Sequence, residues 1–373
     1  MIRRFQTVSE ELFQLHDDIR EQWPSIARIA VALYDEQTDK LHTFVKSSPD
    51  MNLLNHYSVP LAQVPSLLKL ADSGECRVLQ NMSTIREGYS EHSKVVAKHF
   101  KASYTEPFYM GNKLLGFVFF DADEENYFTE SLVRHLHSYS RLIESLIISE
   151  TLPVMALIGM VNTTKDIANI RDSETGKHLI RVARYTQLIA TELADKFDLT
   201  DEYIEYMTRY APLHDIGKVA IPDRILLKPG KLNDEEYRLM QTHVVEGLNM
   251  LDHIINNFNF LNLRHVDLLR DVISAHHERW NGSGYPNGLS GEEIPLAGRI
   301  VTVADVFDAL ASDRIYRAAL PVDDVFEYLQ DQKGIAFDPQ CVDAFLNNKD
   351  RVLEIKEEFK EDFDYSQVEA VSL

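Results

Sequence analysis

The sequence predicts two domains of different fold class. Residues 1–150 are expected to form an α/β domain with an antiparallel sheet, and residues 151–373 an all-helical bundle with its core at 154–350. Three observations support this prediction. The chain has 373 residues, more than one domain of about 100–200 residues usually holds. Convincing strand signals occur only in the first 150 residues, and beyond them the apolar residues recur at helical spacing.

The N-terminal half alternates helix and strand signals. Short runs rich in apolar and β-branched residues are bounded by polar turns, as in antiparallel sheets. The segment Met110-Gly111-Asn112-Lys113 separates two such runs and predicts a β-hairpin. In chain order, the expected elements are an amphipathic helix over 5–20, strands over 26–34 and 41–45 around the turn 35–39, a helix over 61–72, strands over 103–109 and 114–121, and a helix that starts near Thr129.

The helix that starts near Thr129 has a regular apolar stripe. Its members are spaced four, three, four and three residues apart, which is a heptad pattern of about two repeats. The stripe would pack either on the sheet of its own domain or against a second copy of the chain. We expect Pro153 to interrupt the helix and to mark the domain junction. The stripe consists of Leu132, Leu136, Tyr139, Ile143 and Leu146.

The C-terminal half has apolar residues at helical spacing throughout. Neither an internal repeat nor a low-complexity tract interrupts the pattern, so a helical bundle is the predicted fold. The acidic stretch from Lys356 to Glu369 is expected to be peripheral. The expected helices cover 154–170, 177–195, 200–213, 234–252, 265–278, 296–312, 321–332 and 338–347.

Charge and cysteine content narrow the function classes. The formal net charge is −21, so the chain should repel a nucleic-acid polymer, which binds through a broad basic surface. A small anionic substrate stays open, because bound cations or a few basic side chains can reverse the field inside one pocket. The two cysteines, Cys76 and Cys341, have no CxxC partner. Their spacing argues against a disulfide framework and against a thiolate zinc site.

Two further observations concern localisation. The first residues, MIRRFQTVSEELFQLHDD, break their apolar run with charges and contain no signal-peptide core. We expect no stretch to reach the length of about 18 uncharged apolar residues that a transmembrane helix needs. The sequence therefore predicts a cytoplasmic protein without a membrane partner.

The C-terminal half contains many side chains that are typical metal ligands. Glu174 and His178 are four residues apart, so on a helix both would face one cation. His214 and Asp215 are adjacent, and a bridging aspartate would let them serve two neighbouring metal ions. Asp305 lies in an apolar helix, where an unpaired carboxylate is costly. The candidate ligands are Glu174, His178, His214, Asp215, His243, His276, His277 and Asp305.

The composition of this set indicates the kind of metal site. A mixture of imidazole and carboxylate suits octahedral iron or manganese better than a closed zinc site. Eight ligands are too many for one catalytic ion, so two or three divalent transition-metal ions are expected. Taken singly, each short pattern is weak, because an isolated histidine or His-Asp dipeptide is usually structural.

Three longer motifs follow in order: His214-Asp215-Ile216-Gly217-Lys218, His276-His277-Glu278 and Gly284-Tyr285-Pro286. Together they resemble the HD-GYP family of cyclic di-GMP phosphodiesterases. The resemblance covers about residues 154–350, and the ordered matches make it specific. It implies an HD-GYP helical bundle in which all eight candidate ligands bind metal.

The resemblance also implies individual roles. Asp215 would bridge two metal ions, and Glu174 would be the extra ligand of members that hold three. Lys218 would contact the scissile phosphate. The loop Gly284-Tyr285-Pro286 would shape the pocket rim or present a surface to a diguanylate cyclase, although a plain turn is the simpler interpretation. The residues expected to lie along the substrate are Asp308, Arg314 and Arg317, the last at a position where the family often has lysine.

The implied reaction is hydrolysis of cyclic di-GMP to the linear dinucleotide pGpG, to GMP, or to both. Hydroxide that bridges two metals would attack phosphorus, and the metals with Lys218 would stabilise the charge that develops. One alternative is the same reaction on 3′,3′-cyclic GMP-AMP. Further alternatives are an HD-type phosphohydrolase that acts on nucleotides or guanosine tetraphosphate, and a non-catalytic cyclic-dinucleotide receptor.

The N-terminal half resembles a GAF-type sensor domain in the order of its elements and in the run Gly116-Phe117-Val118-Phe119-Phe120. The resemblance implies that this domain regulates the catalytic domain and that the chain forms a homodimer. A degenerate domain used only for dimerisation is the alternative. We expect Cys76 to be an inert core residue.

Overall fold

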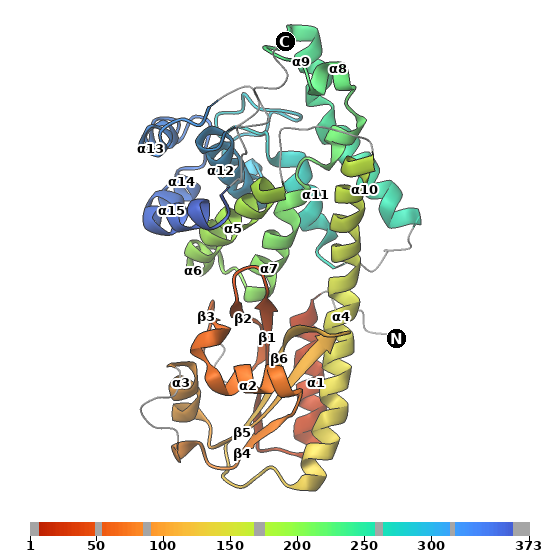
Figure 1. Ribbon diagram of the computed structural model, residues 1–373, viewed down its shortest axis with the longest axis vertical. Helices are drawn as coiled ribbons and strands as arrows, with labels where there is room; N and C mark the ends of the chain where they lie inside the picture. The colour runs from red at the N-terminus through yellow and green to blue at the C-terminus, as the bar shows by residue number, and fades with distance from the viewer. Residues whose placement is uncertain are drawn as a thin grey trace, which may run out of the picture. The chain divides into compact units, whose positions relative to one another are not determined.

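The computed structural model describes residues 7–48, 54–84, 91–167, 176–257, 264–313 and 318–360. The chain divides into two compact units, Met1–Pro153 and Val154–Leu373 (Figure 1). The predicted fold classes are confirmed. The first unit contains a six-stranded antiparallel sheet with helices, and the second is built from helices.

The sheet of the first unit has the strand order β3-β2-β1-β6-β5-β4, and every neighbouring pair is antiparallel. The predicted hairpin is confirmed, because Met110 pairs with Lys113 across a two-residue loop. The short edge strands β3 and β4 had no clear sequence signal. The strands are β1 (Ile26–Asp35), β2 (Lys40–Ser47), β3 (Ser58–Pro60), β4 (Arg77–Leu79), β5 (Ala102–Met110) and β6 (Lys113–Ala122).

Helices complete the core of the first unit. Helix α1 (Val8–Gln22) packs on β1 and β2 through its buried apolar residues. Helix α2 (Pro65–Ser73) follows the 3-10 turn Leu61–Gln63 and packs on an apolar cluster of β1, β2 and β6. Helix α3 (Glu91–His99) contributes Val96 to a second apolar cluster. The apolar faces of these three helices therefore pack on the sheet or on its flanking loops.

Helix α4 (Glu130–Ile167) is continuous and contains Pro153. The predicted interruption at this proline is therefore wrong. Of the predicted stripe, Leu132, Leu136 and Ile143 are buried. The ring of Trp23, just after α1, lies 6.1 Å from that of Tyr139, so the stripe packs within its own unit.

Helix α4 is also relevant to the prediction that the chain has no transmembrane helix. An 18-residue window within Glu130–Met160 is long and apolar enough to cross a membrane, with a mean hydropathy of 1.7. Every 18-residue window of this segment contains Glu144, so the expectation that no uncharged apolar stretch of this length exists is not contradicted. Length and composition alone are weak evidence for a membrane span, since core helices of soluble proteins pass the same test.

Cys76 is exposed, so the expectation of a core position is wrong. The residue lies in the loop between α2 and β4, where the chain leaves the helix through Gly74 in a left-handed conformation. Connections of this kind run over the protein surface, where side chains are accessible to solvent. Cys341 is buried.

The second unit brings many short helices together. Three expected helices are divided in the structure, one of which is the helix over 177–195, which breaks at Leu193. The one over 200–213 ends at Tyr210 before Pro212, and the one over 234–252 breaks at Thr242. The helices are α5 (Gly176–Glu192), α6 (Ala194–Phe197), α7 (Asp201–Tyr210), α8 (Asp223–Leu226), α9 (Asp234–Gln241), α10 (His243–Asn257), α11 (Val266–Ala275), α12 (Leu296–Ala311), α13 (Val322–Asp331), α14 (Pro339–Leu346) and α15 (Lys349–Glu358), with 3-10 turns η3 (Ala211–Leu213), η4 (Ile216–Ala220) and η5 (Gly291–Glu293).

An aromatic cluster holds α5, α12, α13 and α14 together. The Phe307 ring lies 5.2 Å from that of Tyr185, 4.8 Å from Phe345 and 5.4 Å from Phe326. Such pairs add to the energy of burial and set the relative position of helices. The cluster therefore determines how α5 and α12 face each other at the residues that concern function.

Breaking the buried ion pair between β1 and β6 should destabilise the first unit. Arg28 Nη1 lies 2.5 Å from Asp121 Oδ2, and both side chains are at most 2% exposed. Asp121→Asn would leave the guanidinium uncompensated, so the free energy of unfolding should fall by about 3–5 kcal/mol. Urea unfolding followed by Trp23 fluorescence measures this in a Trp280→Phe background, since the chain has two tryptophans.

The matched control is Glu36→Gln, which breaks the exposed pair between Glu36 and Lys113, 2.6 Å apart. We expect this change to cost less than about 1 kcal/mol. Equal effects of the two substitutions would contradict a stabilising role for the buried pair.

Candidate metal centre

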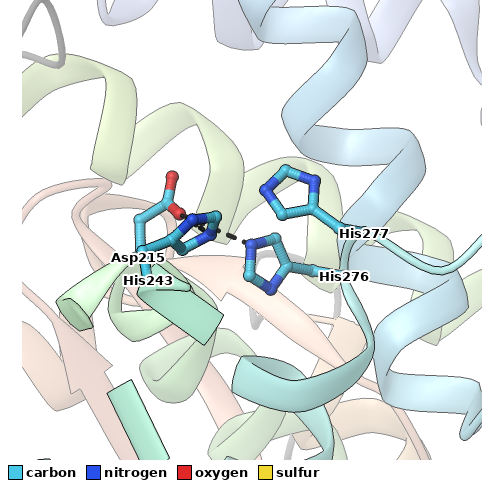
Figure 2. A group of neighbouring side chains, drawn as sticks. All are labelled: Asp215, His243, His276 and His277. Carbon is cyan, nitrogen blue, oxygen red and sulfur yellow. Dashed lines mark ion pairs between the residues drawn. The ribbon is translucent and has the colours of Figure 1, made fainter. Parts of the chain in front are cut away.

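Seven of the eight candidate ligands lie in the described part of the chain, and they form two groups. Within each group, the ligand atoms are within 4.8 Å of one another. Figure 2 shows the first group, whose side chains converge from three separate segments. Glu174 lies outside the described residues. The first group is Asp215, His243, His276 and His277, and the second is His178, His214 and Asp305.

Short segments between helices bring the first group together. His214 and Asp215 lie between η3 and η4, and His243 is the first residue of α10. Turn η4 can lie against α10 because Gly217 has no side chain. A Cβ atom there would be 1.9 Å from the carbonyl oxygen of His243 and 2.4 Å from the amide nitrogen of Gly247. This close approach puts Asp215 next to His243.

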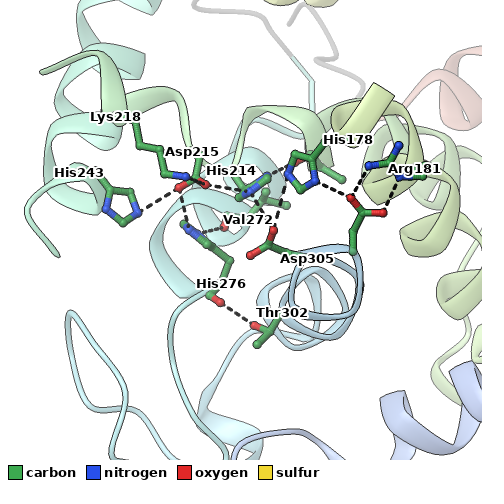
Figure 3. Close-up of polar contacts among 12 residues, drawn as sticks. His178, Arg181, His214, Asp215, Lys218, His243, Val272, His276, Thr302 and Asp305 are labelled. Carbon is green, nitrogen blue, oxygen red and sulfur yellow. Dashed lines mark hydrogen bonds and ion pairs between the residues drawn. The ribbon is translucent and has the colours of Figure 1, made fainter. Parts of the chain in front are cut away.

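The two carboxylate oxygens of Asp215 face different partners, as Figure 3 shows. Oδ1 lies 3.1 Å from His243 Nε2 and 3.4 Å from His276 Nε2. Oδ2 lies 3.1 Å from His214 Nε2 and 2.7 Å from Lys218 Nζ. Asp215 therefore connects the first group to His214, which belongs to the second.

The second group is built around Asp305 on α12. Its Oδ1 lies 3.7 Å from His178 Nε2 and 3.8 Å from His214 Nε2. These separations are too long for hydrogen bonds. They are the spacing expected of ligands that share an ion placed between them.

Hydrogen bonds at Nδ1 determine the tautomer of three of the histidines. His214 Nδ1 is 2.7 Å from the carbonyl oxygen of Ala211, and His243 Nδ1 is 2.7 Å from that of Met240. His276 Nδ1 is 3.0 Å from the carbonyl of Ile273. A carbonyl only accepts, so each Nδ1 carries the hydrogen and each Nε2 keeps a lone pair for a cation.

The buried polar atoms of the centre fit a bound cation. Asp215 Oδ1, His243 Nε2, His276 Nε2 and Asp305 Oδ1 are buried and make no hydrogen bond of acceptable geometry. Leaving such atoms unsatisfied costs about 1–3 kcal/mol each. Divalent cations coordinated by these nitrogen and oxygen atoms would remove the cost.

Protonation also favours cation binding. Burial raises the pKa of Asp215, but Lys218 and His214 outweigh burial and hold the pKa well below its usual value. Burial lowers the pKa of His276 and holds that of His277 well below the usual value. At neutral pH the carboxylate is therefore ionised and these imidazoles are neutral, which are the forms that bind metal.

The Gly284-Tyr285-Pro286 loop lies against the first group. A Cβ atom at Gly284 would be 2.4 Å from the amide nitrogen of Arg279 and 2.6 Å from the carbonyl oxygen of His277. Only glycine allows this approach. The Tyr285 ring then stacks on the His277 ring at 4.7 Å.

Glu278 holds this loop in shape, a role that sequence reasoning missed. Its carboxylate is buried and accepts hydrogen bonds from the backbone amides of Asn287 at 2.8 Å and Leu289 at 3.1 Å. The available signal was its position directly after the two histidines. A carboxylate there can reach the loop that returns to them.

Asp308 was expected to lie along the substrate, but its side chain has other contacts. The side chain is buried behind His178, whose Nδ1 donates a hydrogen bond to Oδ2 at 2.8 Å. Both carboxylate oxygens of Asp308 also accept hydrogen bonds from Arg181. Asp308 therefore contacts a candidate metal ligand instead of facing the expected substrate. Asp308 shares a face of α12 with Asp305 three residues earlier, and that face packs on α5.

Sequence reasoning also missed Arg181. Its guanidinium is buried and donates to Asp308 through Nε at 2.6 Å and Nη2 at 2.8 Å. The signal was an arginine three residues after His178 on the same helix, where both face one neighbour. Arg314 and Arg317 lie outside the described residues, so their substrate contacts stay predictions.

Known proteins resemble the part of the chain that carries the candidate metal centre. Residues 162–341 match the family model described as "HD domain". The chain is 39% identical over 216 residues to a cyclic di-GMP phosphodiesterase of Vibrio cholerae, which covers 54% of this chain and 43% of that protein. It is 44% identical over 189 residues to the cyclic di-GMP phosphodiesterase response regulator RpfG of Xanthomonas campestris, covering 51% and 47%.

A third relative has a different named substrate. The 3′3′-cGAMP-specific phosphodiesterase 2 of Vibrio cholerae is 39% identical over 197 residues, covering 53% of this chain and 36% of that protein. The chain thus spans less than half the length of these three relatives. Among solved structures, the GAF domain/HD domain protein of Geobacter sulfurreducens covers 40% of this chain and 97% of that one, at 12% identity and a TM-score of 0.33.

Manganese should stabilise the second unit through Asp215. An ion that binds only the folded chain adds about 2.7 kcal/mol at a concentration of 100 Kd. We expect Mn²⁺ to raise the melting temperature of the wild type, and Asp215→Ala to abolish the rise because the central carboxylate is lost. Differential scanning fluorimetry with and without Mn²⁺ measures the difference. Asp343→Ala, which removes an exposed carboxylate, should keep the full rise, and an equal loss there would refute the assignment.

Proposed function

We propose that this chain is a metal-dependent phosphodiesterase that hydrolyses a cyclic dinucleotide. One observation carries the proposal: the Asp215 carboxylate lies between two groups of candidate ligands, with the Lys218 ammonium 2.7 Å from Oδ2. A paired metal site with an adjacent cation suits the hydrolysis of a phosphate diester. Relatives named as cyclic-dinucleotide phosphodiesterases support the same reaction.

The residues present fit two divalent metal ions, iron or manganese. Asp215 would bridge them. Glu174 would add a ligand for a third ion. His243, His276 and His277 would complete one position, and His178, His214 and Asp305 the other. No thiolate takes part, since neither cysteine belongs to the groups.

The chain's own side chains would contribute to the reaction in distinct ways. When bound, the metal ions would activate water and stabilise charge on the phosphoryl oxygens. Lys218 would share in neutralising that charge, which needs a cation placed before the reaction starts. Asp215, ionised at neutral pH, would hold Lys218 in place. Water would attack phosphorus in line with the leaving 3′-oxygen, and no covalent intermediate on the protein is required.

Substrate contacts would come from the edge of the centre. Lys218 and the half-buried Tyr285 lie next to the first group. The loop Gly284-Tyr285-Pro286 would form the pocket rim. Arg314 and Arg317 would lie along the substrate, since guanidinium groups bind phosphate with two donors. Asp308 would act only indirectly, through His178.

Cyclic di-GMP is the first candidate substrate, with pGpG, GMP or both as products. A second candidate is 3′,3′-cyclic GMP-AMP, because relatives of similar identity bear that name. Base-specific contacts decide between the two. A non-catalytic receptor is disfavoured because the seven candidate ligands among the described residues converge in two groups.

The proposal extends to regulation and assembly. The first unit would regulate the second as a sensor domain. A homodimer would form through α4, which leaves Leu142 58% and Leu152 50% exposed. The loop at Tyr285 is a candidate surface for a diguanylate cyclase. A cytoplasmic location, predicted from the sequence, belongs to the same proposal.

Turnover is the direct test. Metal-loaded protein should cleave cyclic di-GMP, 3′,3′-cyclic GMP-AMP or both under anaerobic conditions with iron or manganese. The two substrates are assayed side by side and resolved by chromatography, and the rate ratio identifies the preferred one. Asp215→Ala should lose all turnover because the bridge is removed, whereas Asp343→Ala should retain it. A fully loaded wild type that cleaves neither dinucleotide would be a receptor or an enzyme inhibited by its first unit.

Metal stoichiometry tests the role of Glu174. If this carboxylate holds a third ion, Glu174→Ala should lower the bound metal by about one ion per chain, because that ion loses one of its ligands. Elemental analysis after gel filtration gives the ratio. An unchanged ratio would mean a site with two ions.

A further inference from the structure

The four histidines of the centre with a hydrogen-bonded Nδ1 are not all supported in the same way. His214, His243 and His276 donate from Nδ1 to backbone carbonyls. His178 donates instead to the carboxylate of Asp308, at 2.8 Å. An imidazole that donates to a carboxylate is a stronger metal ligand than one bonded to a neutral carbonyl. One metal position therefore depends on a side chain that can itself move.

Arg181 immobilises that side chain. Its Nε and Nη2 atoms donate to the two oxygens of Asp308 at 2.6 and 2.8 Å. Burial raises the pKa of Asp308, but the hydrogen bonds from His178 and Arg181 outweigh burial and lower it. A bidentate guanidinium also sets the plane of the carboxylate, which in turn orients the His178 ring.

The C-terminal end of the described chain reaches the same arginine. Arg181 Nη1 donates to the carbonyl oxygen of Phe359 at 2.8 Å, and Nη2 lies 3.2 Å from Ser312 Oγ. Lys177, on the other side of His178, donates to the carbonyl oxygen of Lys360. The segment after α15 is therefore bound by residues on both sides of a candidate metal ligand.

We propose that Arg181 is a positioning residue for His178 that acts through Asp308, with the segment at Phe359 and Lys360 holding it in place. This rests on the metal centre of the proposed function. A chain of contacts then connects the C-terminal segment to one metal position. The position formed by His178, His214 and Asp305 should depend on this chain of contacts, and the position formed around His243 and His276 should not.

The test measures Mn²⁺ binding to the full-length protein. Asp308→Asn and Arg181→Lys should each weaken one bound ion about 10–100-fold, the usual effect of losing an outer-shell partner of a ligand. Binding of the other ion should stay within about twofold. Equilibrium dialysis with elemental analysis gives the affinities. Electron paramagnetic resonance should change from the spectrum of a coupled pair to that of an isolated Mn²⁺ ion.

A matched control separates positioning from general stability. Arg299 and Asp338 form another buried pair of the second unit, with Nη1 and Oδ2 2.6 Å apart, and neither is a candidate ligand. Arg299→Lys should lower the unfolding midpoint yet leave Mn²⁺ binding unchanged. If Arg299→Lys weakens manganese as much as Arg181→Lys, or if Asp308→Asn binds like the wild type, the proposal is wrong.

Truncation after Glu358 tests the C-terminal part. The shortened chain should lose affinity at the same single position, because Arg181 loses the Phe359 carbonyl. Normal binding by this chain would remove the C-terminal segment from the proposal. These readouts do not require turnover, so the binding data decide this inference even if the wild type cleaves no cyclic dinucleotide.

Discussion

The burial of the Asp215 carboxylate is the constraint on which the centre depends. The side chain is only 4% exposed, and an isolated carboxylate with so little access to water would be very costly. Lys218 supplies one positive charge at 2.7 Å, while burial keeps neighbours such as His276 neutral. The surrounding imidazoles therefore offer lone pairs rather than charge. An arrangement of this kind is stable when cations occupy the space between the lone pairs.

The rest of the helical unit can be understood as a support for that arrangement. The ligands come from separate helices and from the turns between them, so no single helix could hold them. The aromatic contacts of Phe307 with Tyr185 and Phe345 fix α12 against α5 and α14. The absence of a side chain at Gly217 lets η4 approach α10. Packing far from the metal positions therefore sets distances within them.

The two metal positions differ in how their ligands are held. Backbone carbonyls that orient His243 and His276 lie within the ligands' own segments, so this orientation follows from the local fold. His178 is oriented by Asp308 and Arg181, which come from two different helices. A relay of side chains responds to changes elsewhere in the chain more easily than a helix backbone does. This asymmetry is a physical basis for adjusting one metal position separately.

The sequence by itself determined the fold class and the identity of the candidate ligands. Helical periodicity indicates that one face of a helix is buried, which predicts the fold class. Imidazole and carboxylate groups can bind metal in any fold, so His214 and Asp215 could be recognised as candidate ligands from the sequence. Sequence alone could not place Asp308, because spacing puts it on one face with Asp305 but does not say which helix that face meets. Nor could it identify Arg181 or the exposure of Cys76. Only the tertiary structure decided these, because they depend on which elements pack together, and that packing is a sum of many weak contacts between residues distant in sequence.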